Sequence, residues 1–265
     1  MDETQGFHLA NAAAQGALED LSRAVQAFFG ERLASVVAYG SIVFDDLAPG
    51  YGDLDFVVVM EGNLREGEAR RLAELRRPFR AESASIYSRM LEGAFLPRHM
   101  LDPAREGKGF WWGTSGEREW PRNELGWLVL EFIRTRGVVI AGRDVRGEIP
   151  AAGREQIGLD MRKFCADARE QGKPGTPHCV DWLLSAARLL VLVREGRFSS
   201  KSEAADWGLA KAHGAWREQL PRAKTLRLNP ARADDGDVRT WLATLKPSID
   251  EAADELEREI NRAGF

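Results

Sequence analysis

The chain has 265 residues, which is enough for one large domain or for two domains of medium size. Hydrophobic residues make up 44% of it and charged residues 29%, the composition of an ordinary globular protein. The net charge of -4 argues against a nucleic-acid-binding protein, because such proteins normally carry a basic face. We therefore expect no nucleic acid among its partners.

The cysteines and the apolar segments bear on the cellular compartment. Cys165 and Cys179 lie in helical patterns, so we expect buried thiols in a reducing compartment; a disulfide or thiol chemistry is the alternative. Residues 1–6 lack the apolar core of a signal peptide, and the longest apolar run, 189–193, is too short to cross a bilayer. These features predict a cytoplasmic protein without a membrane partner.

In the first half of the chain, helical and strand-like patterns alternate. Apolar residues at helical spacing stop at Gly30, which suits a left-handed cap, and Pro78 closes a charged amphipathic helix. The predicted elements are a helix over 14–29, strands over 35–39 and 54–60, a helix over 66–77, a strand over 91–96, a helix over 123–136 and a strand over 138–141. This alternation predicts an α/β-type domain with a mixed sheet.

Beyond Pro150 the strand-like segments disappear. The predicted helices cover 154–171, 180–194, 202–211 and 236–263, and the glycines and prolines of 172–177 can only form a loop. We therefore expect an α+β domain over 1–152 and an all-α helical bundle over 153–265. A cleft between two such domains is the default place for a binding site.

Two aspartates interrupt the start of the valine-rich strand. Asp53 and Asp55 stand at i and i+2, a spacing that directs both side chains to one face of a strand. Two like charges beside a buried sheet are costly unless a cation neutralises them, and Mg²⁺ prefers such oxygen ligands. The alternative is a solvated strand end with two exposed aspartates.

Gly40 and Ser41 directly follow the first predicted strand. Their backbone amides and the serine hydroxyl are groups that can bind phosphate oxygens. A strand, Gly-Ser, a short excursion and a strand bearing Asp-x-Asp together resemble the polymerase-beta-like nucleotidyltransferase superfamily. The resemblance implies that Ser41 holds the nucleotide phosphates, that Asp53 and Asp55 bind magnesium, and that a third carboxylate on a neighbouring strand completes the site.

Glu82 and Glu92 compete for this third position. Glu82 lies in a segment with little strand character, whereas Glu92 interrupts an apolar, strand-like run. The adjacent Gly93 would leave room for a substrate to approach. An exposed acidic residue is the alternative for either position, and we favour Glu92.

The resemblance extends over most of the chain to the aminoglycoside nucleotidyltransferases that adenylylate streptomycin and spectinomycin. The segments that carry it are Tyr39-Gly40-Ser41, Gly52-Asp53-Leu54-Asp55, the strand 91–97, the strand 137–142, Ala187-Arg188 and the run Ser-Lys-Ser-Glu-Ala-Ala-Asp-Trp over 200–207. The resemblance implies that Glu92 is the catalytic base and that Arg188 and Lys201 contact the nucleotide.

Residue chemistry agrees with these two contacts. Arg188 lies in an apolar helix, where a guanidinium needs an anionic partner, either a protein carboxylate or a phosphate. Lys201 precedes a helix, so its ammonium adds to the positive end of the helix dipole; a surface lysine is the alternative.

The acceptor is less well defined by the sequence. In the family, acidic residues of the helical domain hold the amines of the antibiotic, and this chain offers Asp181, with His178 near another expected acidic position. Trp120 matches a family tryptophan associated with streptomycin; a structural tryptophan is the alternative.

These residues predict a cytoplasmic, monomeric enzyme, with two Mg²⁺ ions as cofactors. We expect it to transfer AMP from ATP to a hydroxyl of streptomycin or spectinomycin and to release pyrophosphate. Its rivals are a nucleotidyltransferase that modifies a protein, RNA or another small molecule, and a nucleotide-sensing module without catalysis.

Overall fold

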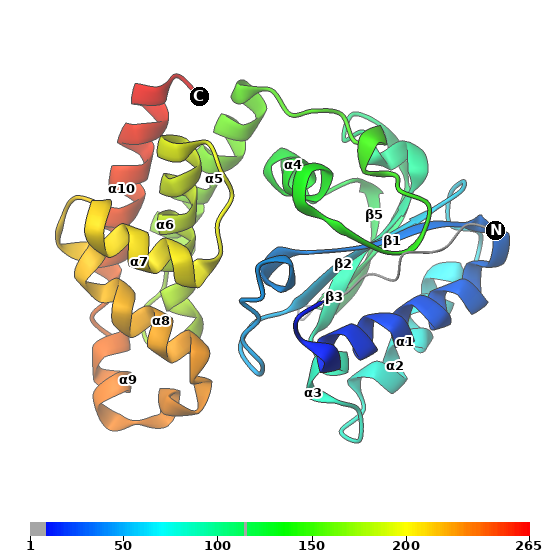
Figure 1. Ribbon diagram of the computed structural model, residues 1–265, viewed down its shortest axis with the longest axis horizontal. Coiled ribbons are helices and arrows are strands. Elements are labelled where there is room, and N and C mark those ends of the chain that lie inside the picture. The colour runs from blue at the N-terminus through cyan, green and yellow to red at the C-terminus, as the bar shows by residue number, and fades with distance from the viewer. Residues whose placement is uncertain (1–8, 114–115) are drawn as a thin grey trace. The chain divides into compact units, whose positions relative to one another are not determined.

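The N-terminal part of the chain is built around a six-stranded mixed sheet. The computed structural model describes residues 9–113 and 116–265, which separate into two compact units, Met1–Ala152 and Gly153–Phe265. The strands are β1 (Leu33–Tyr39), β2 (Leu54–Met60), β3 (Leu91–Pro97), β4 (Glu106–Gly113), β5 (Gly116–Arg122) and β6 (Val138–Gly142). Their order across the sheet is β5-β4-β3-β2-β1-β6 (Figure 1). Because β2 and β3 are parallel and the other neighbours are antiparallel, the predicted mixed sheet is confirmed.

The two faces of this sheet are covered by different helices. The helices α1 (Ala12–Phe29), α2 (Glu68–Arg80) and α3 (Ile86–Arg89) share a hydrophobic core with one face. Alternate residues of β2, Leu54, Phe56, Val58 and Met60, belong to that core. Asp55 lies between them in sequence and therefore faces the other side, where α4 (Gly126–Arg136) contacts β1.

The hairpin of β4 and β5 was not predicted from the sequence. Trp112 of β4 is fully buried against the α2 face, and its indole Nε1 donates to the Leu72 carbonyl at 3.1 Å. β5 is an edge strand with a proline, Pro121, and several exposed charged residues. Such residues are typical of an edge that does not pair further, and they obscure the strand pattern.

The C-terminal unit is all-α, as predicted. Its helices are α5 (Arg154–Gln171), α6 (Val180–Glu195), α7 (Lys201–Lys211), α8 (Leu220–Leu228), α9 (Gly236–Leu242) and α10 (Lys246–Ala263). α10 packs against α5 and α6, and α6 packs against α7 (Figure 1). The helix predicted over 236–263 is two helices, because α9 ends at Leu242 and Pro247 stands in the first turn of α10.

A buried acidic residue ties the C-terminal unit together. Glu255 of α10 is only 2% exposed and accepts hydrogen bonds from Arg194 Nη2 (2.9 Å), the His213 amide (2.8 Å) and Trp216 Nε1 (2.8 Å). A buried carboxylate is stable only when it is paired in this way. Among the described helices of either unit, none has both the length and the apolarity needed to cross a membrane.

Candidate functional site

The turn after β1 brings the backbone of Gly40 against a carboxylate. Gly40 begins the short 3-10 helix η2 (Gly40–Phe44) and has a φ of +76°, which glycine adopts readily. A Cβ at this position would lie 2.1 Å from Asp55 Oδ2. Glycine is therefore required here both by the backbone conformation and by the close approach of the Asp55 side chain. Ser41 follows and is half-buried.

The register of the sheet places Asp55 beside Glu92. Asp55 of β2 pairs with Tyr39 of β1 on one side and with Glu92 of β3 on the other. Partners at the same register of neighbouring strands direct their side chains to the same face, so these two carboxylates are neighbours. Asp53 stands directly before β2 rather than within it. All three carboxylates are half-buried.

Tyr39 reports on the charge at this edge of the sheet. Its side chain is 7% exposed, and its pKa is raised well above the usual value. Burial is the largest cause, followed by the negative charges of Asp55, Glu92 and Asp53. The three predicted carboxylates therefore act on one phenol, and the turn between β1 and η2 lies in a negative field.

The arrangement fits a metal ion that is only partly coordinated by protein. Among the residues the structure describes, no group of three or more histidine, cysteine, aspartate or glutamate side chains is gathered as a complete metal site. Mg²⁺ is commonly held by one or two carboxylates, with phosphate oxygens and water as its other ligands. The neighbouring Asp55 and Glu92 carboxylates, with Asp53 close by, suit that mode of binding.

The rival glutamate lies outside the sheet. Glu82 is exposed in the segment between α2 and α3, where its carbonyl accepts a hydrogen bond from Arg89 Nη1 at 2.9 Å. The expected role of Gly93 was wrong. Gly93 is buried, and a Cβ there would lie 2.1 Å from the Phe56 carbonyl oxygen, so its glycine is explained by strand packing rather than by access for a substrate.

In the C-terminal unit, three of the predicted residues lie together. Ser200 caps α7 by accepting from the Glu203 amide at 3.0 Å, and Lys201 is the first helical residue. The Lys201 ammonium forms an ion pair with the Asp181 carboxylate, which lies 3.5 Å from His178 Nδ1. A predicted phosphate ligand and two predicted acceptor ligands are thus in one ion-pair group.

Arg188 is held near the start of the same helix. Its Nε donates to the carbonyl of Ser199 at 3.1 Å, and its side chain is half-buried in α6. The bond orients the guanidinium beside the cap of α7.

Trp120 does not present its ring to a ligand. It is 2% exposed, and its indole is stacked on that of Trp111 with ring centroids 4.9 Å apart. The expectation that Trp120 contacts the acceptor is therefore corrected in favour of the structural alternative, because its ring packs within the β4–β5 hairpin.

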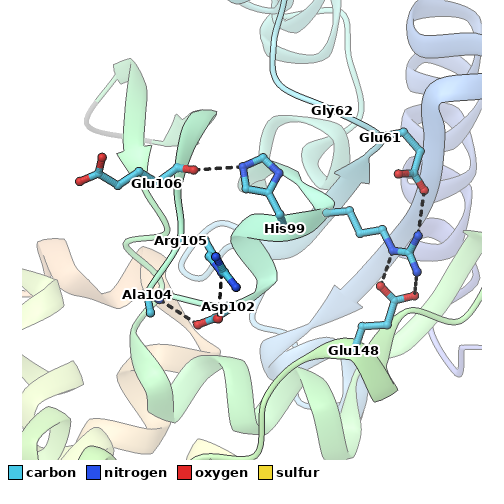
Figure 2. A pocket seen from close by; sticks show the side chains of 9 residues that line it. Glu61, Gly62, His99, Asp102, Ala104, Arg105, Glu106 and Glu148 are labelled. Atoms are coloured by element: carbon cyan, nitrogen blue, oxygen red, sulfur yellow. Dashed lines mark hydrogen bonds and ion pairs between the residues drawn. The ribbon is translucent and has the colours of Figure 1, made fainter.

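A wide hollow occurs at the end of the central strands opposite to the end that carries the carboxylates. It has a volume of about 880 Å³ and lies beyond the ends of β2 and β3, where Arg98 binds Glu148 and Glu61 (Figure 2). His99 Nε2 lies 3.0 Å from the carbonyl oxygen of Glu106, a contact that is drawn as a dashed line in Figure 2. Ion pairs and backbone contacts account for these polar groups, and none of the predicted site residues lines the hollow.

Comparison with known proteins supports the resemblance found in the sequence. The family model of the aminoglycoside adenylyltransferase C-terminal domain matches residues 162–255. No curated protein matches the sequence. Among solved structures, the chain is similar to that of spectinomycin adenyltransferase AAD(9) from Enterococcus faecialis with ATP and spectinomycin, at a TM-score of 0.66 and 15% identity over 93% of this chain and 98% of that one. Residues 162–255 thus match the family of the aminoglycoside adenylyltransferase C-terminal domain, and the fold of the whole chain is similar to that of a solved adenyltransferase, in agreement with the resemblance seen in the sequence.

Proposed function

We propose that the chain is a nucleotidyltransferase that transfers AMP from ATP to a hydroxyl of streptomycin or spectinomycin and releases pyrophosphate. The observation that carries the proposal is the register of β1, β2 and β3, which makes Asp55 and Glu92 neighbours beside the Gly40 turn. The family of residues 162–255 supports the proposed acceptor class. The similar fold of AAD(9), a structure with ATP and spectinomycin, supports both proposed substrates.

The three carboxylates would bind the metal ions, and one of them would also act as the base. Asp53, Asp55 and Glu92 would hold two Mg²⁺ ions, which when bound supply positive charge to the phosphate oxygens. Glu92 would in addition take the proton of the attacking hydroxyl as general base. Glu92 is half-buried near the start of β3, so part of its side chain is accessible to a substrate.

Each unit contains residues that the resemblance assigns to the nucleotide. Ser41 and the Gly40 turn offer a hydroxyl and backbone amides, and the positive φ of Gly40 turns the chain at this point. In the C-terminal unit, Lys201 and Arg188 would bind phosphate oxygens through charge-assisted hydrogen bonds. Lys201→Ala should weaken ATP binding by about 1–3 kcal/mol, measured by calorimetry with Mg²⁺.

The acceptor amines would be bound by Asp181, with His178 beside it. Asp181 forms an ion pair with Lys201, so its carboxylate competes with a phosphate for the Lys201 ammonium. We therefore expect Asp181→Asn to weaken binding of the acceptor without weakening binding of ATP. A protonated His178 would repel a cationic acceptor.

The test is pyrophosphate release from ATP and Mg²⁺ in the presence of a panel of aminoglycosides, with Asp55→Asn as the inactive reference. Release that depends on streptomycin or spectinomycin, and is lost in the variant, supports the proposal. Release with other acceptors only would retain the reaction and reject the antibiotic. No release with any acceptor, while ATP still binds, would favour a nucleotide-sensing module.

A further inference from the structure

A second, basic cavity occurs on the face of the sheet covered by α2. Its volume is about 280 Å³, and it lies between the C-terminal half of α2 and the ends of the β4–β5 hairpin. Three arginines line it, together with one carboxylate and small residues: Arg76, Arg77, Arg80, Glu117, Ala73, Gly113 and Gly116. The lining side chains therefore carry two more positive than negative charges.

The buried arginine is incompletely paired. Arg76 is 4% exposed, and its Nη1 alone donates to the Gly113 carbonyl and to Glu117 Oε1, both at 2.8 Å. Its Nε and Nη2 are buried and have no hydrogen-bond partner within the described part of the chain. A desolvated guanidinium with two unsatisfied donors is costly, and its charge is only partly offset because Glu117 is itself 36% exposed.

The other two arginines are accessible. Arg77 and Arg80 are exposed and stand three residues apart, so they are neighbours on the helix surface. Arg80 Nη1 donates to the carbonyl oxygen of Arg89 at 3.1 Å. The acceptor in this bond is a neutral carbonyl group, so the bond does not neutralise the charge of Arg80. Basic residues in the last turn of a helix also complement its dipole, but that effect explains neither the cavity nor the burial of Arg76.

We propose that this cavity is a binding site for a small phosphate-bearing anion. Arg77 and Arg80 would bind the anion oxygens, and Arg76, whose charge Glu117 offsets only in part, would stabilise the anion electrostatically. The volume of about 280 Å³ is at the lower end of the range of ligand pockets and is large enough for inorganic phosphate or pyrophosphate.

The cavity is separate from the carboxylate site. Gly93 pairs with Trp112, so Gly113, at the end of β4, lies at the same end of the strands as Glu92. The α2 face is nevertheless the opposite one from Asp55. The proposal rests on α2 and the hairpin alone and does not depend on the function proposed above.

The experiment is calorimetric titration of the full chain with phosphate and with pyrophosphate, without Mg²⁺ and at low ionic strength. Omitting the metal leaves the carboxylates of the other face repulsive to anions. Arg77→Gln combined with Arg80→Gln should raise the dissociation constant about tenfold or more, because two charge-assisted contacts are lost. Arg70→Gln, an exposed arginine of the same helix that does not line the cavity, is the matched control and should change nothing.

Glu117→Gln distinguishes an anion site from a structural ion pair. The glutamine can still accept from Arg76, but it removes the competing negative charge, so the anion should bind several-fold more tightly. Tighter binding of pyrophosphate than of phosphate would identify a diphosphate as the preferred form, and equal binding a single phosphoryl group. Absence of saturable binding, or unchanged binding in the double arginine variant, would overturn the proposal, as would unchanged binding in Glu117→Gln.

Discussion

Gly40 offers a sharp test of the carboxylate site, because one added methyl group would perturb both its backbone and Asp55. Gly40→Ala must adopt the present φ of +76°, which costs a non-glycine residue about 1–2 kcal/mol. The new Cβ would also lie 2.1 Å from Asp55 Oδ2, whereas ordinary contact begins at 3.4 Å. The carboxylate must therefore move by about 1 Å, a displacement that typically costs about 10²-fold in rate.

Gly67 provides the matched control. It has the same φ of +76°, but a Cβ there meets no described atom within 4 Å. Gly67→Ala should therefore lower the free energy of unfolding by a similar amount, measured in urea, and leave kcat/KM for adenylyl transfer unchanged. Full activity in Gly40→Ala, or an equal loss of activity in both variants, would refute the assignment of Asp55 to the site.

Three further predictions concern acidic residues. Glu92→Gln should lower kcat by about 10²-fold or more in a steady-state assay, whereas the exposed Glu82→Gln should change it little; the reverse result would identify Glu82 as the base. Glu255→Ala should lower the free energy of unfolding by about 3–5 kcal/mol, because Arg194 loses its buried ion pair with Glu255. Glu170→Ala, at an exposed position, should change it by no more than about 0.5 kcal/mol. A similar change in both variants would contradict the role of the buried network. The pKa of Glu131 is lowered chiefly by the hydrogen bond that its carboxylate accepts from Arg134, so the ionised carboxylate stabilises the fold above its unfolded pKa and this stabilisation is lost as the pH falls through the lowered pKa. Glu131→Gln should therefore make the free energy of unfolding less dependent on pH in the acid range. An unchanged pH dependence would argue against this role of Glu131.

Local patterns were sufficient to predict the elements that carry the site. β2 was predicted with its observed bounds, because a buried strand gives a continuous apolar run that ends at Glu61. α5 was also predicted with its observed bounds. The helix predicted over 66–77 was ended too early, since α2 continues through Pro78 to Arg80.

Features that depend on partners distant in sequence were not predictable. The pairing of Asp55 with Glu92 depends on β3 lying parallel to β2, which no residue of either strand specifies alone. Trp120 was assigned to the acceptor because it matches a family tryptophan; its burial could not be foreseen, since it comes from Trp111 on the other strand of an unrecognised hairpin. The ion pair between Lys201 and Asp181 likewise joins two helices that the sequence presents as separate elements.

The place of β6 in the sheet has a consequence for folding during synthesis. β1 pairs with β6 through Val36 and Ala141, so one edge of β1 has no partner until about a hundred further residues have left the ribosome. An unpaired, apolar strand edge is a template for aggregation. The nascent chain is therefore most vulnerable while β2 to β5 are complete and β6 is still in the exit tunnel, and chaperone dependence should fall once residue 142 emerges.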